Sequence, residues 1–364
     1  MAWFNIAQDY HNFALNKMRM TIMNDIEKPE LDTQELKAQE KKERKEELKE
    51  WFYFRKKEFL KNCNIVKQLV IRSVKVQYRN SVIGIFWTIL NPLLNMLVMY
   101  LVFSNMFGRS AGTTPTDAET YALYLLCGNI IFGMMRTSTY QALPSLVQNR
   151  GLLTKNKISY NVFPLSHTLS AMVNFGFSFI ALLGVMFVVW LQGQAVFSVN
   201  IFLIFVMLPA LFLFCYGLSL VLSALYTFFR DIMHFYNVFL TLWMYLTPIF
   251  YSVSVFEGKN DFKSSFMTTI IKSNPMYYFV EYFRAVVYRC AAHEGAISAL
   301  TEQIATETNV GALNTLTATL ADTVEMAQLP GFGDVALLYA IGGVATLIGA
   351  IVFMCTKRRF IYNI

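Results

Sequence analysis

Long runs of apolar residues alternate with short polar connections over most of this 364-residue chain. A helix needs about 20 apolar residues to cross a hydrocarbon layer about 30 Å thick, and six runs meet that requirement. They span residues 82–106, 120–142, 165–191, 200–228, 232–251 and 335–356. The pattern predicts an all-α, polytopic membrane protein in which residues 82–364 form one domain with six transmembrane helices.

Composition agrees with this prediction, and the positions of the positive charges orient the protein. Hydrophobic residues make up 55% of the chain and charged residues only 15%, which argues against an ordinary soluble domain. Lys and Arg mark cytoplasmic connections. Arg109 stands alone between the first two runs on one side, whereas the other side carries Arg72, Lys75, Arg79, Arg150, Lys155, Lys157, Arg230, Lys357, Arg358 and Arg359. The stretch 252–290, which has mixed charges, is the one connection that does not follow this pattern. We expect a multi-pass plasma membrane protein with both termini in the cytoplasm.

Residues 1–60 form a polar extension before the first apolar run. Residues 25–61 hold 22 charged side chains, 11 acidic and 11 basic, and many opposite charges stand three or four positions apart. Such pairs support an exposed helix, so we predict a cytoplasmic helical tether, with disorder of its first half as the alternative. Apolar residues at helical spacing in residues 1–20 predict an amphipathic helix on a membrane or a partner.

Residues 61–81 have the pattern of an amphipathic helix that lies in the membrane interface. At about 100° per residue, valines and leucines lie on one side and a narrow opposite face carries Lys61, Arg72, Lys75 and Arg79. Such a helix directs its cations toward lipid phosphates or an acidic partner. A solvated charged face without a ligand is the alternative.

The sequence carries no pattern of a catalytic or metal site. The GxxxxGK[ST] phosphate-binding motif is absent, so any ATP hydrolysis that drives this protein must occur on another chain. Neither HExxH nor a Ser/His/Asp arrangement occurs among the apolar runs, and the 5 Cys and 4 His are scattered. We expect no enzyme activity, no cofactor or metal in this chain, and no nucleic acid partner.

Five blocks of sequence occur in a recognisable order: QYRNSVIGIFWTILNPLL, LVQNRGLLTKNKISYNVFPLSHTLS, FFRDI, LTPIFYS and NPMYYFVEYFRAVVY. Together they resemble the membrane subunit of ABC-2-type exporters of cell-surface polysaccharides, which include teichoic acid, O-antigen and capsule permeases. The resemblance covers residues 65–290 and the final helix. It implies a homodimer of six-helix subunits that pairs with two copies of a separate ATP-binding subunit. That subunit would hold ATP and Mg, and the assembly would move a lipid-linked glycan outward.

The resemblance also implies where the ATPase docks. In that family the connection between the second and third spans contacts the ATPase, which here implicates Asn149, Arg150, Leu152, Leu153 and Lys155. A second contact is implied at the turn with Arg230 and Asp231. An ordinary basic loop is the alternative for the first site, and capping of two helix ends is the alternative for the second.

Two segments between the fifth and sixth predicted spans need separate interpretations. Residues 252–290 resemble the family's pair of short helices that enter the outer leaflet and return, and Pro275 is expected to start the second helix. Two further complete spans are the alternative. Residues 291–330 lie outside the family pattern and predict an external insert of one or two helices.

A glycan passage needs flat apolar faces for sugar rings. The candidate passage residues are aromatic side chains of the apolar runs and one arginine: Phe86, Trp87, Tyr100, Arg136, Trp243, Tyr245, Phe250 and Tyr251. An aromatic belt at the membrane interfaces is the alternative for the rings. Arg136 either meets a substrate phosphate or extends to the cytoplasmic surface. Pro92 and Pro248 lie inside predicted spans and are expected to bend them.

We therefore predict a permease subunit that exports a lipid-linked polysaccharide or teichoic acid-type polymer, powered by separate ATPase subunits. An ABC-2 exporter of drugs or lipids is the closest alternative. An integral membrane glycosyltransferase or acyltransferase is an alternative of another class. It would require acidic or histidine side chains clustered on one side of the membrane.

Overall fold

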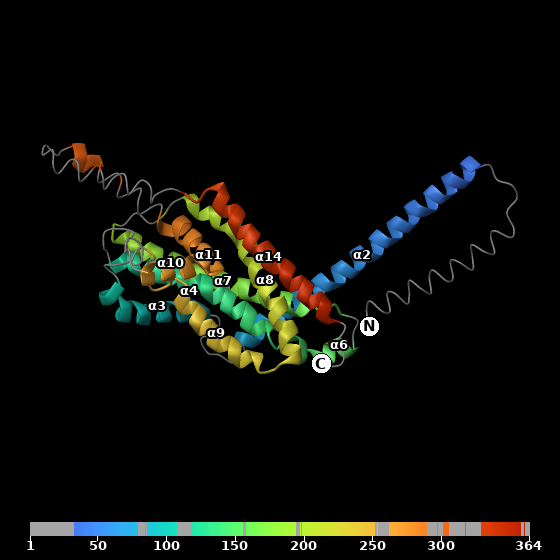
Figure 1. Ribbon diagram of the computed structural model, residues 1–364, viewed down its shortest axis with the longest axis horizontal. Helices are drawn as coiled ribbons and strands as arrows, with labels where there is room; N and C mark the ends of the chain where they lie inside the picture. The colour runs from blue at the N-terminus through green and yellow to red at the C-terminus, as the bar shows by residue number, and fades with distance from the viewer. Residues whose placement is uncertain are drawn as a thin grey trace.

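The chain folds into a bundle of helices, with a long helix that projects from one end of it (Figure 1). The computed structural model describes residues 33–78, 84, 86–107, 118–155, 158–193, 197, 199–251, 253, 262–289, 297, 301–305, 317, 329–357 and 360. Every regular element within these ranges is helical, which confirms the all-α prediction.

Each predicted span contains a helix. The helices are α3 (Phe86–Phe107), α4 (Ala118–Ala142), α7 (Val162–Leu191), η1 (Val199–Leu203) followed by α8 (Ile204–Phe228), α9 (Ile232–Leu246) and α14 (Phe332–Thr356). By length and composition, the described residues include three helices that suffice to cross a membrane, at Val162–Leu191, Val199–Phe228 and Phe332–Thr356. Phe86–Val102 and Ile232–Leu246 are shorter apolar helices. The protein is thus a multi-span membrane protein, and the count of six spans stays a prediction.

Helix α4 lies at the centre of the bundle and packs against α3, α7, α8 and α11. Its side chains Leu123, Leu126 and Met135 have no exposed surface. Three hydroxyl groups join α4, α7 and α8, because Ser138 Oγ lies 3.1 Å from Thr168 Oγ1 and 3.2 Å from Ser219 Oγ. Hydroxyl contacts of this kind hold membrane helices together where lipid removes the hydrophobic driving force.

Helix α14 packs most extensively against α8, and glycines bring the two backbones together. A Cβ on Gly217 of α8 would stand 2.4 Å from the carbonyl atoms of Ala345, and one on Gly342 would stand 2.5 Å from the Ala210 carbonyl oxygen. No real side chain tolerates such distances. The close approach lets Thr346 Oγ1 donate to the Leu213 carbonyl oxygen at 2.7 Å.

The projecting helix is α2 (Thr33–Tyr78). It crosses the predicted boundary between the extension and the interfacial helix without a break, because the segment contains neither Gly nor Pro. Its last part lies along α7, with Val66 buried and Asn174 Nδ2 3.3 Å from Gln77 Oε1. The amphipathic helix predicted for residues 1–20 and the side chain of Arg79 lie outside the described residues.

Short helices lie at both ends of the bundle. At one end, α5 (Ser145–Gln148) and α6 (Arg150–Lys155) connect α4 to α7. At the other end, α10 (Phe262–Ser273) and α11 (Pro275–Arg284) form the predicted pair of short helices (Figure 1). Pro275 begins α11 as expected, and a π-helical turn, η3 (Ala285–Arg289), follows it. Entry of this pair into a membrane stays a prediction, and most of the predicted 291–330 insert lies outside the described residues.

The prediction that Pro248 bends a continuous span is wrong. Helix α9 ends at Leu246, and Thr247 adopts an extended conformation with φ −85° and ψ 130°. A proline disfavours the helical conformation of the residue before it, and with Thr247 extended the helix stops instead of bending. Pro92, in contrast, lies inside α3 as expected.

Candidate functional site

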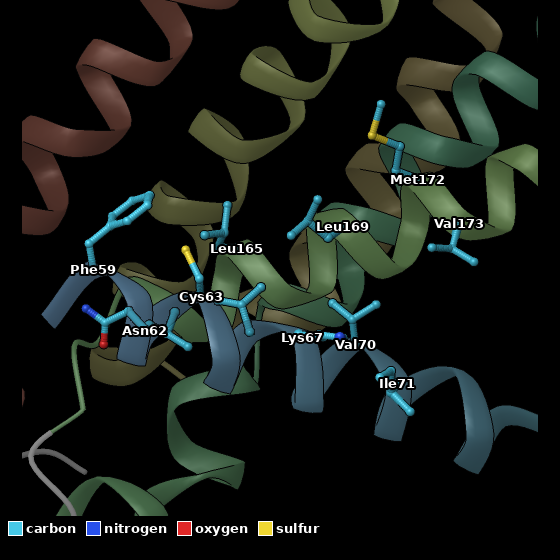
Figure 2. Close-up of a pocket in the computed structure, with 12 residues that line it drawn as sticks. Phe59, Asn62, Cys63, Lys67, Val70, Ile71, Leu165, Leu169, Met172 and Val173 are labelled. Atoms are coloured by element: carbon cyan, nitrogen blue, oxygen red, sulfur yellow. The ribbon is translucent and has the colours of Figure 1, made fainter. Parts of the chain in front are cut away.

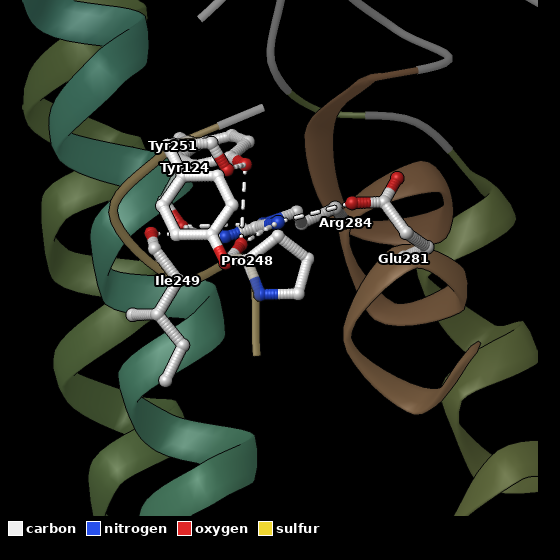
Figure 3. Close-up of polar contacts among 6 residues, drawn as sticks. All are labelled: Tyr124, Pro248, Ile249, Tyr251, Glu281 and Arg284. Atoms are coloured by element: carbon white, nitrogen blue, oxygen red, sulfur yellow. Dashed lines mark hydrogen bonds and ion pairs between the residues drawn. The ribbon is translucent and has the colours of Figure 1, made fainter. Parts of the chain in front are cut away.

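The most deeply buried charge among the described residues is Arg284, at the end of α11. Its Nη1 donates to the Pro248 carbonyl oxygen at 2.8 Å and to Glu281 Oε1 at 3.0 Å. Its Nη2 donates to the carbonyl oxygens of Ile249 and Tyr124, each at 3.2 Å (Figure 3). The guanidinium carbon also lies 3.4 Å from the centroid of the Tyr124 ring. Arg284 therefore ties α4, α11 and the chain after α9 to one another.

Arg284 supplies hydrogen-bond donors that the end of α9 leaves missing. Residues 248–251 follow that end, so no N–H groups of a continuing helix are available to donate to their carbonyl oxygens. Arg284 supplies donors to the first two carbonyls, Tyr121 Oη donates to Phe250 O at 2.9 Å, and Tyr124 Oη donates to Tyr251 O at 2.5 Å. All four carbonyls thus have donors, as buried backbone requires. We call residues 248–251 and these donors the arginine clamp.

A glycine makes room for the clamp. A Cβ on Gly128 of α4 would lie 2.9 Å from Arg284 Nη2 and 3.1 Å from Ile249 Cγ2. Any side chain at this position would push the guanidinium away from the Tyr124 carbonyl. Gly128 is therefore part of the geometry that seats Arg284.

Asn274 forms a second junction at the same end of the bundle. Its Oδ1 accepts from Trp243 Nε1 at 2.7 Å and from the backbone N–H of Met276 at 3.0 Å, which caps α11. Its Nδ2 donates to Thr247 Oγ1 at 2.9 Å. The amide therefore connects the end of α9 to the start of α11.

Replacing Asn274 with alanine is expected to destabilise the protein by about 1–3 kcal/mol, because a helix cap is lost and buried donors lose their acceptor. Asn274→Asp buries a charge and loses the bond to Thr247, but it should cost less, since its carboxylate still accepts from Trp243 and Met276 and lies at the N-terminus of α11, where the helix dipole favours negative charge. Thermal unfolding in mild detergent measures both. Equal losses for the two variants would show that the shared acceptor oxygen is unimportant.

Four of the candidate passage residues lie around these two junctions. The Tyr100 ring lies 6.5 Å from that of Tyr121, Trp243 bonds Asn274, Phe250 is buried, and Tyr251 Oη donates to the Tyr245 carbonyl oxygen at 2.9 Å. The Tyr245 side chain itself is exposed. The structure therefore brings most of the predicted aromatics together, in contacts that hold helix ends in place.

The remaining passage candidates lie elsewhere. Phe86 and Trp87 are exposed at the start of α3, which places them about 20 Å along the helix from Tyr100 at 1.5 Å per residue. Arg136 is exposed near the far end of α4, about 18 Å from Tyr124 by the same measure. These three residues do not share a site with the arginine clamp.

Sequence reasoning missed Arg284, although a signal was present. Glu281 and Arg284 are the charged residues of the stretch 273–288, and they stand three positions apart. Opposite charges at this spacing on a helix can pair, and ionisable residues in apolar segments mark functional or structural sites. The described residues contain no group of three metal-ligating side chains.

The proposed coupling residues lie at the opposite end of the bundle. Leu152 and Leu153 of α6 are half-buried and pack against a cluster that includes Val66, Phe228 and Phe360. Asn149 Nδ2 bonds the Ser145 carbonyl oxygen at 2.8 Å. These contacts attach α6 to the bundle and leave Arg150 exposed. The side chain of Lys155 lies outside the described residues.

Arg230 and Asp231 are also exposed at this end. Asp231 occupies the N-cap position of α9, but its side chain makes no capping hydrogen bond. The structure therefore does not support the alternative in which this carboxylate caps α9 through a hydrogen bond. Both side chains remain on the surface, one turn from Phe228, which packs in the same cluster as Leu152 and Leu153.

The bundle, with its short α9 and its paired short helices α10 and α11, defines a multi-span membrane protein whose buried polar groups position helices. The ABC-2 type transporter family profile matches residues 65–288, which includes the clamp and α5–α6. The chain belongs to this family of transporter membrane subunits.

Curated relatives carry more specific names. The O-antigen export system permease protein RfbA of Myxococcus xanthus is 28% identical over 222 residues, which cover 60% of this chain and 78% of that protein. The protein of the same name from Klebsiella pneumoniae is 26% identical over 212 residues, 56% of this chain and 73% of that protein. A second Klebsiella pneumoniae protein of that name is 25% identical over 205 residues.

Proposed function

We propose that this chain is the permease subunit of an ATP-driven exporter that moves a lipid-linked cell-envelope polysaccharide across the plasma membrane. The observation that carries the proposal is the family match over residues 65–288, together with relatives named as O-antigen export permeases. ATP and Mg would be held by two copies of a separate ATP-binding subunit, and the permease would act as a homodimer with both termini in the cytoplasm.

In this proposal the ATPase docks on α5–α6 and on the turn between α8 and α9. The support is physical: the leucines of α6 pack inward, so the short helix is a firm platform, while Arg150 and Arg230 present positive charge outward. Because α6 is packed firmly against the bundle, a movement of the docked ATPase would displace α4, α7 and α8 with it. Exposed charges at a rim guide docking and select the partner.

Charge reversal tests the docking surface. The double variant Arg150→Glu/Arg230→Glu is expected to retain roughly ten-fold less ATP-binding subunit on co-purification, because this proposal has the two arginines face acidic side chains of that subunit, which the new carboxylates would repel. The matched control Lys263→Glu/Lys272→Glu places the same change on α10 at the other end of the bundle, and it should retain the subunit as the unmodified chain does. Undiminished retention by the first variant would exclude this surface.

Deletion of the gene tests the transported substrate. If the chain exports a polysaccharide, the deletion strain should lack one glycan at its surface. The same glycan should accumulate inside the cell, still attached to its lipid. The exposed Phe86, Trp87 and Tyr245 are the proposed passage lining, so their alanine variants should reduce export while the ATPase still co-purifies. Unchanged surface glycans would favour the alternative exporter of drugs or lipids.

A further inference from the structure

The charge of α2 changes where the helix meets α7. Its first part, residues 33–58, mixes acidic and basic side chains, whereas residues 59–78 carry Lys61, Lys67, Arg72 and Lys75 and no acidic side chain. The facing segment of α7, residues 162–173, also contains no acidic side chain. Within these two segments, the positive charge of α2 therefore has no acidic counterpart.

An apolar groove of about 650 Å³ runs between these two helices. Val66 and Val70 of α2 and Leu165 and Leu169 of α7 line it, and Figure 2 shows labelled side chains from both helices along its length. Apart from the Cys63 thiol, its polar lining groups belong to Asn62 and Lys67. The volume is within the range of about 300–1,000 Å³ that holds small-molecule ligands.

Cations border the groove. Lys67 lies on its wall, and Ile71 lines both the groove and a smaller hollow formed with Gln68, Arg72 and Lys75. All three cationic side chains are exposed. A ligand with a hydrocarbon chain in the groove could therefore place a negative group beside Lys67, with Arg72 and Lys75 next along the helix.

We propose that this groove binds an anionic membrane phospholipid, with an acyl chain between α2 and α7 and the phosphate near Lys67, Arg72 and Lys75. The charge complementarity selects an anionic headgroup, and the apolar walls select a chain. Such a lipid would hold the end of α2 against the bundle. The site is separate from the proposed passage and docking surface, and it does not depend on the transported substrate.

Native cysteines provide the test. Cys63 lines the groove, Cys355 is exposed near Phe353, and Cys127 and Cys215 are buried. The full chain with Cys290→Ser is reconstituted in vesicles of phosphatidylcholine, with or without phosphatidylglycerol, and labelled with neutral N-ethylmaleimide. Phosphatidylglycerol should lower the rate at Cys63 several-fold relative to Cys355. Dividing the rate at Cys63 by the rate at Cys355 corrects for a change in surface potential that affects both thiols.

Two charge variants distinguish a specific lipid site from a general electrostatic attraction between the protein and an anionic membrane. Lys67→Gln/Arg72→Gln/Lys75→Gln should abolish the protection, because each surface cation contributes roughly five-fold to binding of an anionic lipid. Lys45→Gln/Lys49→Gln/Lys56→Gln removes the same charge from exposed positions on the first part of α2 and should keep it. The proposal would be overturned if both variants lost the protection of Cys63, or if the first variant kept it.

Co-purified lipid gives an independent measurement. Phosphatidylglycerol should be enriched over its share of the membrane in the unmodified chain and in the second variant, and not in the first. Protection by phosphatidylcholine alone, or by a polyprenyl phosphate but not phosphatidylglycerol, would show that the groove takes a different ligand. Failure of these tests would leave the export proposal unaffected.

Discussion

Replacing Arg284 with glutamine is expected to destabilise the protein by about 3–5 kcal/mol, the usual cost of breaking a buried charged network. The carbonyl oxygens of Pro248 and Ile249 lose their guanidinium donors, and Tyr124 loses its cation. The unfolding temperature in mild detergent should fall by roughly 5 °C or more. Size-exclusion chromatography after heating measures the surviving folded fraction.

Lysine at this position should rescue only part of the loss. Its ammonium is a single point of charge, whereas the planar guanidinium reaches carbonyls on α4 and beyond α9 at once and also covers the Tyr124 ring. Arg136→Gln is the matched control, because that arginine is exposed on α4. If Arg284→Gln unfolds at the same temperature as the control, the clamp does not hold the bundle together.

The second large effect is expected at a pair of adjacent glycines in α14. Gly342→Ala should destabilise the bundle by about 1–3 kcal/mol or more, because its Cβ would lie 2.5 Å from the Ala210 carbonyl oxygen and push α8 away. Gly343→Ala has nothing within 4 Å of its Cβ and should be neutral or stabilising by up to about 1 kcal/mol through helix propensity.

The contrast between the two variants is the measurement, since composition and helix position are matched. Thermal unfolding should place Gly342→Ala well below Gly343→Ala. Gly217→Ala on the facing helix should behave as Gly342→Ala does, because its Cβ would meet the Ala345 backbone at 2.4 Å. Equal unfolding temperatures at positions 342 and 343 would contradict the close packing of α8 and α14.

Several elements followed from local sequence alone. The apolar runs located the helices of the bundle, since the length of such a run is a property of consecutive residues. Pro275 marked the start of α11, because proline suits a first helical turn and Asn274 before it can cap the helix. The end of α9 was missed for a related reason: Pro248 was taken to bend the helix, yet the residue before it leaves the helical region.

The candidate site could be predicted only in part. Leu152 and Leu153 were expected to face a partner, and the structure packs both against their own bundle, leaving Arg150 outside. Their role in docking stays a prediction. Of the aromatics, Trp243 and Tyr251 form bonds that hold helix ends, and no sequence pattern distinguishes such a ring from one that meets a ligand.

By itself the sequence determined the helical, membrane-spanning character of the chain and its place in the ABC-2 family, because apolar run lengths and ordered motifs are local properties. Only the tertiary structure decided which polar groups meet. Arg284 reaches Tyr124 across 160 positions of sequence, and of the adjacent Gly342 and Gly343 only Gly342 faces α8 closely. The partner of a buried group depends on how distant backbones approach, and that distance is set by packing of the whole bundle.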